Sequence, residues 1–181
     1  MKKLLMSFTL FAISIVSYAS DVTAIDNFNS SKYLGKWYEI ARLPNKFEDK
    51  CLPPVTATYQ LNPDDDNKII VTNECNTRDS VPEVAGGMAS FVESHNIAKL
   101  KVTFLPKFIR WLPFGYGDYW VLNVDYDRLA LVGSPDHKYL WILARSEDLP
   151  ESDLKAIILI AKEQGFDTSQ LIYNYTPPSI F

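Results

Sequence analysis

Short apolar or alternating runs recur along the chain from residue 37 onward, and turn-forming residues separate them. Residues 99–105, KLKVTFL, alternate most regularly, with Leu100, Val102 and Phe104 on one face and lysine or threonine on the other. A period of two residues is typical of a β-strand with one buried face. The same pattern predicts strands at residues 37–41, 56–61, 68–73, 88–92, 99–105, 119–124, 129–133 and 139–144.

The period changes after the last of these strands. Four apolar residues have the i, i+3, i+4, i+7 spacing of one helix face; they are Leu154, Ile157, Ile158 and Ala161. Pro150 suits the first helical position, and Gly165 is placed to end the helix. A last strand-like run occupies residues 171–175.

Eight meandering strands in an open sheet would leave two edges with unpaired backbone groups. Closing the sheet into a barrel removes both edges, and an eight-stranded barrel has room for side chains or one small ligand. We therefore predict an all-β fold, an eight-stranded antiparallel up-and-down β-barrel with one C-terminal α-helix packed on the outside.

Residues 1–19 have the features of a secretory signal peptide. Two lysines precede the apolar run 4–16, and small residues before the end of the segment favour cleavage after Ala19. The run is too short for a transmembrane anchor, which needs about 20 apolar residues. No cysteine lies near the cleavage point, so a lipid-anchored form is not expected. Residues 20–181 then form one domain.

Charge argues against a nucleic-acid partner. Removal of the two leader lysines from the 18 basic residues leaves 16 against 22 acidic residues, a net charge of −6. No basic stripe offsets this balance. We expect the protein to be a monomer or a weak homodimer.

The two cysteines, Cys51 and Cys75, flank the predicted hairpin of residues 56–73. An even pair in an exported protein usually forms a disulfide, and a hairpin would bring the two ends together. A metal site is not expected, because His95 and His137 are distant in sequence from the cysteines and from each other. No cofactor is expected either.

The stretch KYLGKWYEIAR, residues 32–42, places a glycine two residues before a tryptophan. A barrel needs a floor, and Trp37 could supply it from the first strand while Gly35 lets the preceding segment cross beneath. Arg145 follows the eighth strand, which neighbours the first in a closed barrel. A guanidinium stacked on the indole would contribute about 0.5–2 kcal/mol.

These residues resemble the motifs of the lipocalin family. Residues 29–42 resemble its glycine-x-tryptophan motif, Asp125 with Tyr126 its second motif, and Arg145 its third. The chain is most similar to bacterial outer-membrane lipocalins, relatives of apolipoprotein D, although it departs from their lipobox cysteine. The resemblance implies a cup-shaped barrel that binds fatty acids or lysophospholipids. All three motifs should gather at the closed end, so they are expected to hold the fold rather than bind ligand.

Alternation around the motif residues predicts the cavity wall. Leu143, Trp141 and Tyr139 share the face of Arg145, and Glu39 and Ala41 share the face of Trp37. Four further residues are assigned to the interior, namely Tyr59, Phe91, Phe104 and Tyr119. An apolar wall with a few tyrosine hydroxyls suits an acyl chain with a polar head. The alternative is a barrel filled by its own aromatic side chains.

The connection at residues 105–118 should lie at the open mouth. It is unusually apolar for a surface loop and contains Phe108, Ile109, Trp111, Leu112 and Phe114 beside two cations. Such a loop is expected to contact a membrane or a partner while lipid passes. The alternative is a lid packed over the cavity.

The pattern predicts a non-catalytic carrier or scavenger of a small hydrophobic ligand in the bacterial cell envelope, periplasmic or secreted, with or without association with the outer membrane. The alternative is a lipid-active enzyme in the same barrel. The chain has no nucleophile-elbow motif, and Glu39 is the one acidic residue assigned to the interior, where burial could keep it neutral as a general acid. A haem or pigment would need an inward histidine.

Overall fold

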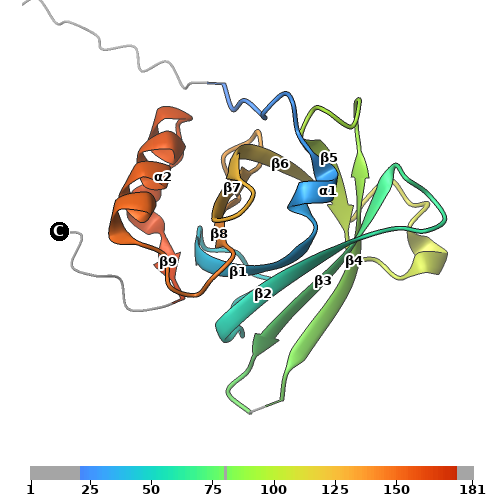
Figure 1. The fold of residues 1–181 in the computed structure, drawn as a ribbon. Helices are drawn as coiled ribbons and strands as arrows, with labels where there is room; N and C mark the ends of the chain where they lie inside the picture. Colours follow the sequence, from blue (N-terminus) through green and yellow to red (C-terminus); the bar gives the residue numbers. More distant parts are fainter. Residues whose placement is uncertain (1–20, 80, 175–181) are drawn as a thin grey trace, which may run out of the picture.

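Eight antiparallel strands follow one another around a closed barrel in the computed structural model (Figure 1), which describes residues 21–79 and 81–174. The predicted signal peptide lies outside these residues. The strands are β1 Gly35–Arg42, β2 Leu52–Leu61, β3 Lys68–Asn76, β4 Glu83–Phe91, β5 Lys99–Thr103, β6 Tyr116–Asp125, β7 Leu129–Gly133 and β8 Leu140–Ala144. β1 pairs with β2 through Gly35 and Tyr59, and with β8 through Tyr38 and Ala144, which closes the barrel. The predicted fold class is confirmed.

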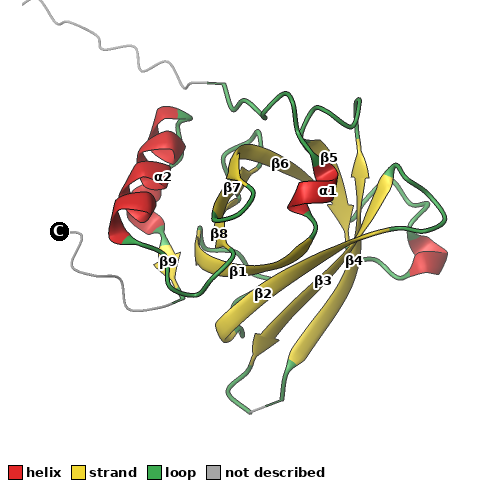
Figure 2. Ribbon diagram, viewed as in Figure 1, coloured by secondary structure: helices red, strands yellow, loops and turns green. Residues whose placement is uncertain are grey.

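The helix α2, Glu151–Glu163, lies outside the barrel beside β7 and β8, as Figure 2 shows. Its buried face is the predicted one and packs against outward residues of β8 such as Ile142. Pro150 is the N-cap rather than the first helical residue, one position earlier than predicted. Gly165 follows the helix with a φ of 86°, a conformation that favours glycine.

The chain returns to the barrel after α2. A single turn, η2 Thr168–Gln170, leads into the short strand β9, Ile172–Tyr173, which pairs with the mouth end of β1. The last residue of the predicted run, Tyr175, lies outside the described residues. No helix within the described ranges is long and apolar enough to span a bilayer.

The observed strand ends differ most from the predicted ones where the sequence is rich in glycine or proline. β2 begins at Leu52 and passes through Pro53 and Pro54, whereas the pattern predicted a start at residue 56. β4 begins at Glu83, five residues before the prediction, because pairing with β3 carries Gly86 and Gly87 into the ladder. Tertiary pairing here overrides low strand propensity.

Three short helices were not predicted. They are α1, Ser30–Tyr33, η1, Lys107–Ile109, and η2. One turn of helix is too short to show a period in the sequence. Asn29 caps α1 by accepting a hydrogen bond from the Lys32 amide at 3.1 Å.

The closed end of the barrel is built around Trp37. Its side chain is completely buried, and its Nε1 donates to the Tyr33 carbonyl at 2.8 Å. The Arg145 guanidinium carbon lies 3.7 Å from the ring centroid, so the predicted stacking is present. Arg145 also donates to the carbonyls of Tyr126, Lys36 and Lys32 at 2.9, 3.0 and 2.8 Å. One side chain thus joins three segments of the floor.

Gly35 and the second motif complete this floor. Gly35 has a φ of 93°, and an added Cβ would lie 3.5 Å from Arg145 Nη1, an ordinary contact. The positive φ, rather than a close approach, therefore requires glycine. The Tyr126 hydroxyl accepts from the Asn29 amide at 2.7 Å, and Asp125 accepts from the Asp127 amide at 3.1 Å.

Candidate ligand-binding cavity

A cavity of about 640 Å³ occupies the barrel above this floor. Seven of the nine residues predicted for its wall line it, namely Glu39, Tyr59, Phe104, Tyr119, Tyr139, Trp141 and Leu143. The space exists because small residues face inward between them. Ala57 of β2, Ala85 and Ala89 of β4, and Gly117 of β6 all lie in the lining. The barrel is therefore not filled by its own aromatic side chains.

Two predicted wall residues lie elsewhere. The β1–β8 register shifts between Glu39 and Ala41, so Ala41 pairs with the outward Ile142 and packs in the cluster beneath α2. The bulge reverses the alternation on which its prediction depended. Phe91 is inside the barrel, but its ring lies 6.2 Å from Phe28, in the plug of the closed end below the cavity.

The plug comes from the segment before β1. Ile25 donates to the Val121 carbonyl at 3.0 Å and accepts from the Ala98 amide at 3.0 Å. The Phe28 ring lies 5.3 Å from the ring of Tyr33. The segment therefore crosses beneath the barrel, as predicted, and packs Tyr33 against the lining residues Tyr59 and Tyr119.

Three tyrosine hydroxyls meet near the base. The Tyr119 hydroxyl lies 2.7 Å from both the Tyr33 and the Tyr59 hydroxyl. Burial raises the pKa of all three phenols, that of Tyr59 to about 12, so all remain protonated at neutral pH. Two hydrogen bonds among three O–H groups leave one proton that can be donated to a ligand atom.

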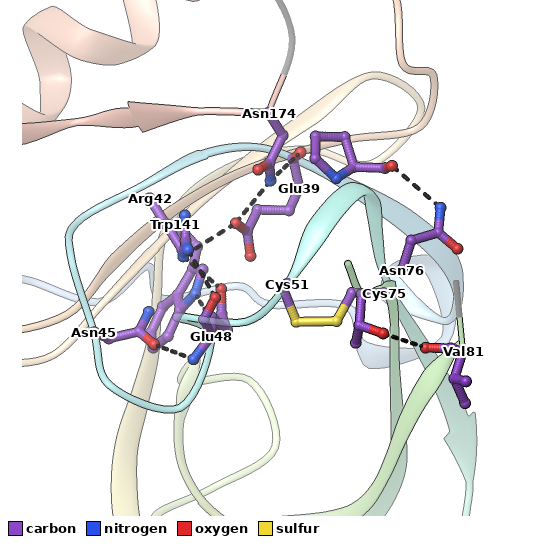
Figure 3. Close-up of a disulfide and its surroundings, with 12 residues drawn as sticks. Glu39, Arg42, Asn45, Glu48, Cys51, Cys75, Asn76, Val81, Trp141 and Asn174 are labelled. Atoms are coloured by element: carbon purple, nitrogen blue, oxygen red, sulfur yellow. Dashed lines mark hydrogen bonds and ion pairs between the residues drawn. A yellow bond between two sulfur atoms is a disulfide. The ribbon is translucent and has the colours of Figure 1, made fainter. Parts of the chain in front are cut away.

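A polar cluster occupies the wall nearer the mouth (Figure 3). The buried Glu39 carboxyl accepts from Asn174 Nδ2 at 2.8 Å and lies 3.6 Å from Arg42 Nε. Glu48 approaches from the β1–β2 loop, with one oxygen 2.8 Å from Arg42 Nε and the other accepting from Trp141 Nε1 at 3.1 Å. The expectation that Glu39 is the one inward acidic residue is therefore wrong. Loop residues such as Glu48 have no period that could assign them to a face.

The surroundings of Glu39 favour its protonated form. Burial is the main cause that raises the pKa of this carboxyl well above 4.5, and the neighbouring charge of Glu48 adds to it. Arg42 and Asn174 act in the opposite direction but do not outweigh burial. The cluster therefore places one guanidinium beside two carboxyl groups, and the pKa of one of them is shifted upward.

We expect Glu39→Gln to remove part of the pH dependence of stability. A raised native pKa means that the folded state binds more protons than the unfolded state above about pH 4.5. The free energy of unfolding therefore falls as pH rises through this window, by up to about 1.4 kcal/mol per pH unit. Urea denaturation at pH 5 and pH 8 should show a smaller fall for Glu39→Gln than for wild type. The exposed Glu147→Gln should match wild type, and equal falls in all three proteins would contradict the assignment.

Both histidines lie away from the cavity. His137 Nε2 is 2.9 Å from the Gln164 carbonyl at the end of α2, and His95 Nε2 is 3.1 Å from Asn67 Oδ1 at the closed end. Neither lines the cavity, so the inward histidine that a haem would need is not provided. Across the described part of the chain, no three acidic, histidine or cysteine side chains gather in a way that could hold a metal ion.

The connection 104–115 lies at the mouth, as predicted. Leu105, Gly115 and Tyr116 line the entrance of the cavity. Phe108 and Trp111 are 78% and 79% exposed and Phe114 is exposed as well, whereas Ile109 and Leu112 are partly buried. The large rings thus face solvent instead of covering the cavity as a lid. Two exposed apolar residues from other mouth loops, Phe47 and Val81, were missed from the sequence.

The disulfide Cys51–Cys75 is present and joins the mouth end of β2 to that of β3 (Figure 3). Its Cα atoms lie 5.4 Å apart, a normal distance for a disulfide. Both cysteines line the upper cavity. The bond indicates an extracytoplasmic location, where disulfides persist.

A closed antiparallel barrel with a plugged floor, an open mouth and a largely apolar cavity defines a binding protein for small hydrophobic molecules. The chain belongs to the lipocalin family, whose lipocalin-like domain matches residues 28–176. Outer membrane lipoprotein Blc of Escherichia coli K12 is 36% identical over 174 residues, which cover 96% of this chain and 93% of that protein. The similarity to this protein and to apolipoprotein D places the chain in the bacterial outer-membrane lipocalin subfamily.

Other relatives are similarly complete. Temperature-induced lipocalin-1 of Arabidopsis thaliana is 38% identical over 161 residues, which cover 88% of this chain and 84% of that protein. Among solved structures, insecticyanin from the tobacco hornworm Manduca sexta aligns with a TM-score of 0.68 and 25% identity. That alignment covers 88% of this chain and 86% of insecticyanin.

Proposed function

We propose that this protein is a non-catalytic carrier or store of a lipid with a single acyl chain, either a fatty acid or a lysophospholipid, in the bacterial cell envelope. The open cavity of about 640 Å³ carries the proposal, since small inward residues leave room for a hydrocarbon chain. The disulfide and the relatives named outer membrane lipoprotein support a periplasmic or secreted location. In this proposal Glu39 is a wall residue and not a general acid, because its Oε1 already accepts a hydrogen bond from Asn174.

Filling the cavity should reduce ligand binding. Ala85 faces inward opposite Asn73, and its neighbour Val84 is exposed on the outer face. An indole at residue 85 would displace part of a bound chain, and the loss of about two methylene contacts at about 0.8 kcal/mol each corresponds to a roughly tenfold weaker affinity. We expect this loss for Ala85→Trp, measured by calorimetry with decanol as an uncharged probe.

Val84→Trp is the matched control, because it adds the same ring one residue away on the outside. It should bind decanol as wild type does, and both variants should retain the circular dichroism of the barrel. Failure of the wild-type protein to bind decanol would contradict the carrier function. Equal affinity of all three proteins would place the ligand outside the cavity.

We further propose that the exposed rings at the mouth contact the membrane during lipid transfer. Phe108, Trp111 and Phe114 lie beside Lys107 and Arg110, a combination suited to the interface of an anionic bilayer. The rings lie on the loop whose residues Leu105 and Gly115 line the entrance, so membrane contact would bring the cavity to the lipid source.

Replacing Phe108, Trp111 and Phe114 with serine should weaken binding to vesicles of phosphatidylethanolamine and phosphatidylglycerol by more than about tenfold, since each removed ring takes several buried carbons from the bilayer. The fold should be unaffected because all three side chains are exposed. Flotation with vesicles measures the effect. Leu159→Ser, an exposed change on α2, is the control. Unchanged flotation of the triple variant would remove the membrane role.

A further inference from the structure

We propose that the cavity selects a chain whose head group is a cationic ammonium over a chain that ends in a carboxylate. The inference rests on the proposed carrier function and favours, among its candidate ligands, a lysophospholipid whose head group ends in an ammonium over a fatty acid. It places the hydrocarbon in the deep part of the barrel, near Tyr59 and Leu143, and the head group near the mouth.

No lysine or arginine side chain lines the cavity in the part of the chain that the structure describes. Arg42 is an inward cation, but it does not line the cavity and already forms an ion pair with Glu48. Its Nε lies 2.8 Å from Glu48 and 3.6 Å from Glu39, and its Nη2 donates to the Glu48 carbonyl at 3.1 Å. A ligand carboxylate would therefore meet no available counter-ion among the lining residues, and any loss of its hydration would oppose binding.

A carboxylate faces the same space from the opposite wall. Glu83 pairs with the inward Cys75 in the β3–β4 ladder, so its side chain belongs to the inner face, and it lines the upper cavity. No ion pair of Glu83 is present among the described residues. Glu74 and Asp118 also border the cavity, but alternation places their side chains on the outer face. Glu83 is thus the inward charge that a cationic head group can neutralise.

Three aromatic side chains, Phe47, Tyr139 and Trp141, also line the cavity. The rings of Tyr139 and Trp141 are 5.8 Å apart and inclined by 14°, and Phe47 lies 5.4 Å from Tyr139. Trp141 Nε1 donates a hydrogen bond to Glu48, which fixes the orientation of the indole. Trp141 also lines the cavity. Aromatic faces attract alkylammonium groups through the ring quadrupole and offer nothing comparable to a carboxylate.

A further inward group lacks a partner. Asn73 lies in the lining opposite Ala85, and its Oδ1 is buried without a hydrogen-bond partner among the residues that the structure describes. A buried carbonyl oxygen of this kind is stabilised by a donor. The N–H groups of an ammonium head can donate to it, whereas a carboxylate has no proton to donate.

Three probes with the same alkyl chain test the inference, namely decylammonium, decanol and decanoate, each titrated calorimetrically at neutral pH below its micelle concentration. Decylammonium should bind about tenfold more tightly than decanoate, with decanol between them. Equal affinities, or tighter binding of decanoate, would overturn the charge selection and leave the carrier function intact. Absence of decanol binding would instead overturn the carrier function.

Charge reversal locates the head group. Glu83→Lys should weaken decylammonium binding and strengthen decanoate binding, each by about threefold or more, and leave decanol unchanged. Glu147→Lys makes the same charge change on an exposed residue beyond the closed end and should alter none of the three affinities. Identical selectivity in both variants would overturn the placement of the head group at the mouth. Glu83 is exposed, so neither substitution is expected to disturb folding.

Discussion

Trp37→Ala is expected to lower the free energy of unfolding by about 3–5 kcal/mol, the usual range for removal of a buried aromatic ring. The side chain is completely buried and forms the floor on which the cavity is built. Its ring lies 5.1 Å from that of Tyr33 and stacks against Arg145. The truncation would leave a void at the point where the plug, β1 and the segment after β8 meet.

Urea denaturation of purified protein measures this loss, with Trp111→Ala as the matched control. Trp111 is 79% exposed, so its removal should change stability by less than about 0.5 kcal/mol. A double-mutant cycle with Arg145→Ala tests the stacking. The coupling energy should exceed about 0.5 kcal/mol, because the two groups are in contact. Strictly additive losses, or a Trp37→Ala loss as small as that of Trp111→Ala, would contradict the role of this ring.

The barrel and its floor could be predicted because one inward residue fixed the alternation on each of the two strands that close the barrel, β1 and β8. Trp37 on β1 and Arg145 after β8 share the floor, so Leu143 and Trp141 followed onto the cavity wall by counting in twos. The four apolar residues of α2 followed from the helical period in the same way. Periodic elements with an independent anchor are therefore predictable to the residue.

The two-residue alternation fails at a β-bulge that the sequence does not predict. The β1 bulge lies between Glu39 and Ala41, in the stretch EIA, which contains no glycine or proline that would predict it. The bulge turns Ala41 outward beneath α2 and brings Arg42 into register with the inward Trp141. The charged cluster on the cavity wall therefore exists because of a feature that only the paired structure reveals.

The empty space itself was also beyond the sequence. Large apolar residues can be predicted to form a cavity wall, but the volume of the cavity depends on small residues such as Ala57, Ala85 and Gly117. The register of their strands could not be fixed from the sequence. The start of β4 was missed because its glycines weaken the strand pattern. The loop residues Phe47 and Glu48 could not be placed because a loop has no period. Specificity for a ligand head group thus depends on the least predictable part of the chain.

Removing the disulfide is expected to lower the free energy of unfolding by about 3.5 kcal/mol. Cys51 and Cys75 are separated by 24 positions, and a cross-link over a loop of this length restricts the unfolded chain by about that amount. The folded barrel needs the bond less, because the β2–β3 ladder already holds both strands together from Thr56 to Leu61. The double variant Cys51→Ala, Cys75→Ala should therefore fold and still close its barrel.

Urea denaturation of the wild-type protein with and without reductant provides the internal control, since reduction should reproduce the loss seen in the double variant. The variant itself should be insensitive to reductant. Its decanol affinity should change little, because the cavity-forming residues of β4 and β8 are held by their own ladders. A wild-type protein whose stability does not respond to complete reduction would show that the cross-link stabilises neither the fold nor the mouth of the cavity.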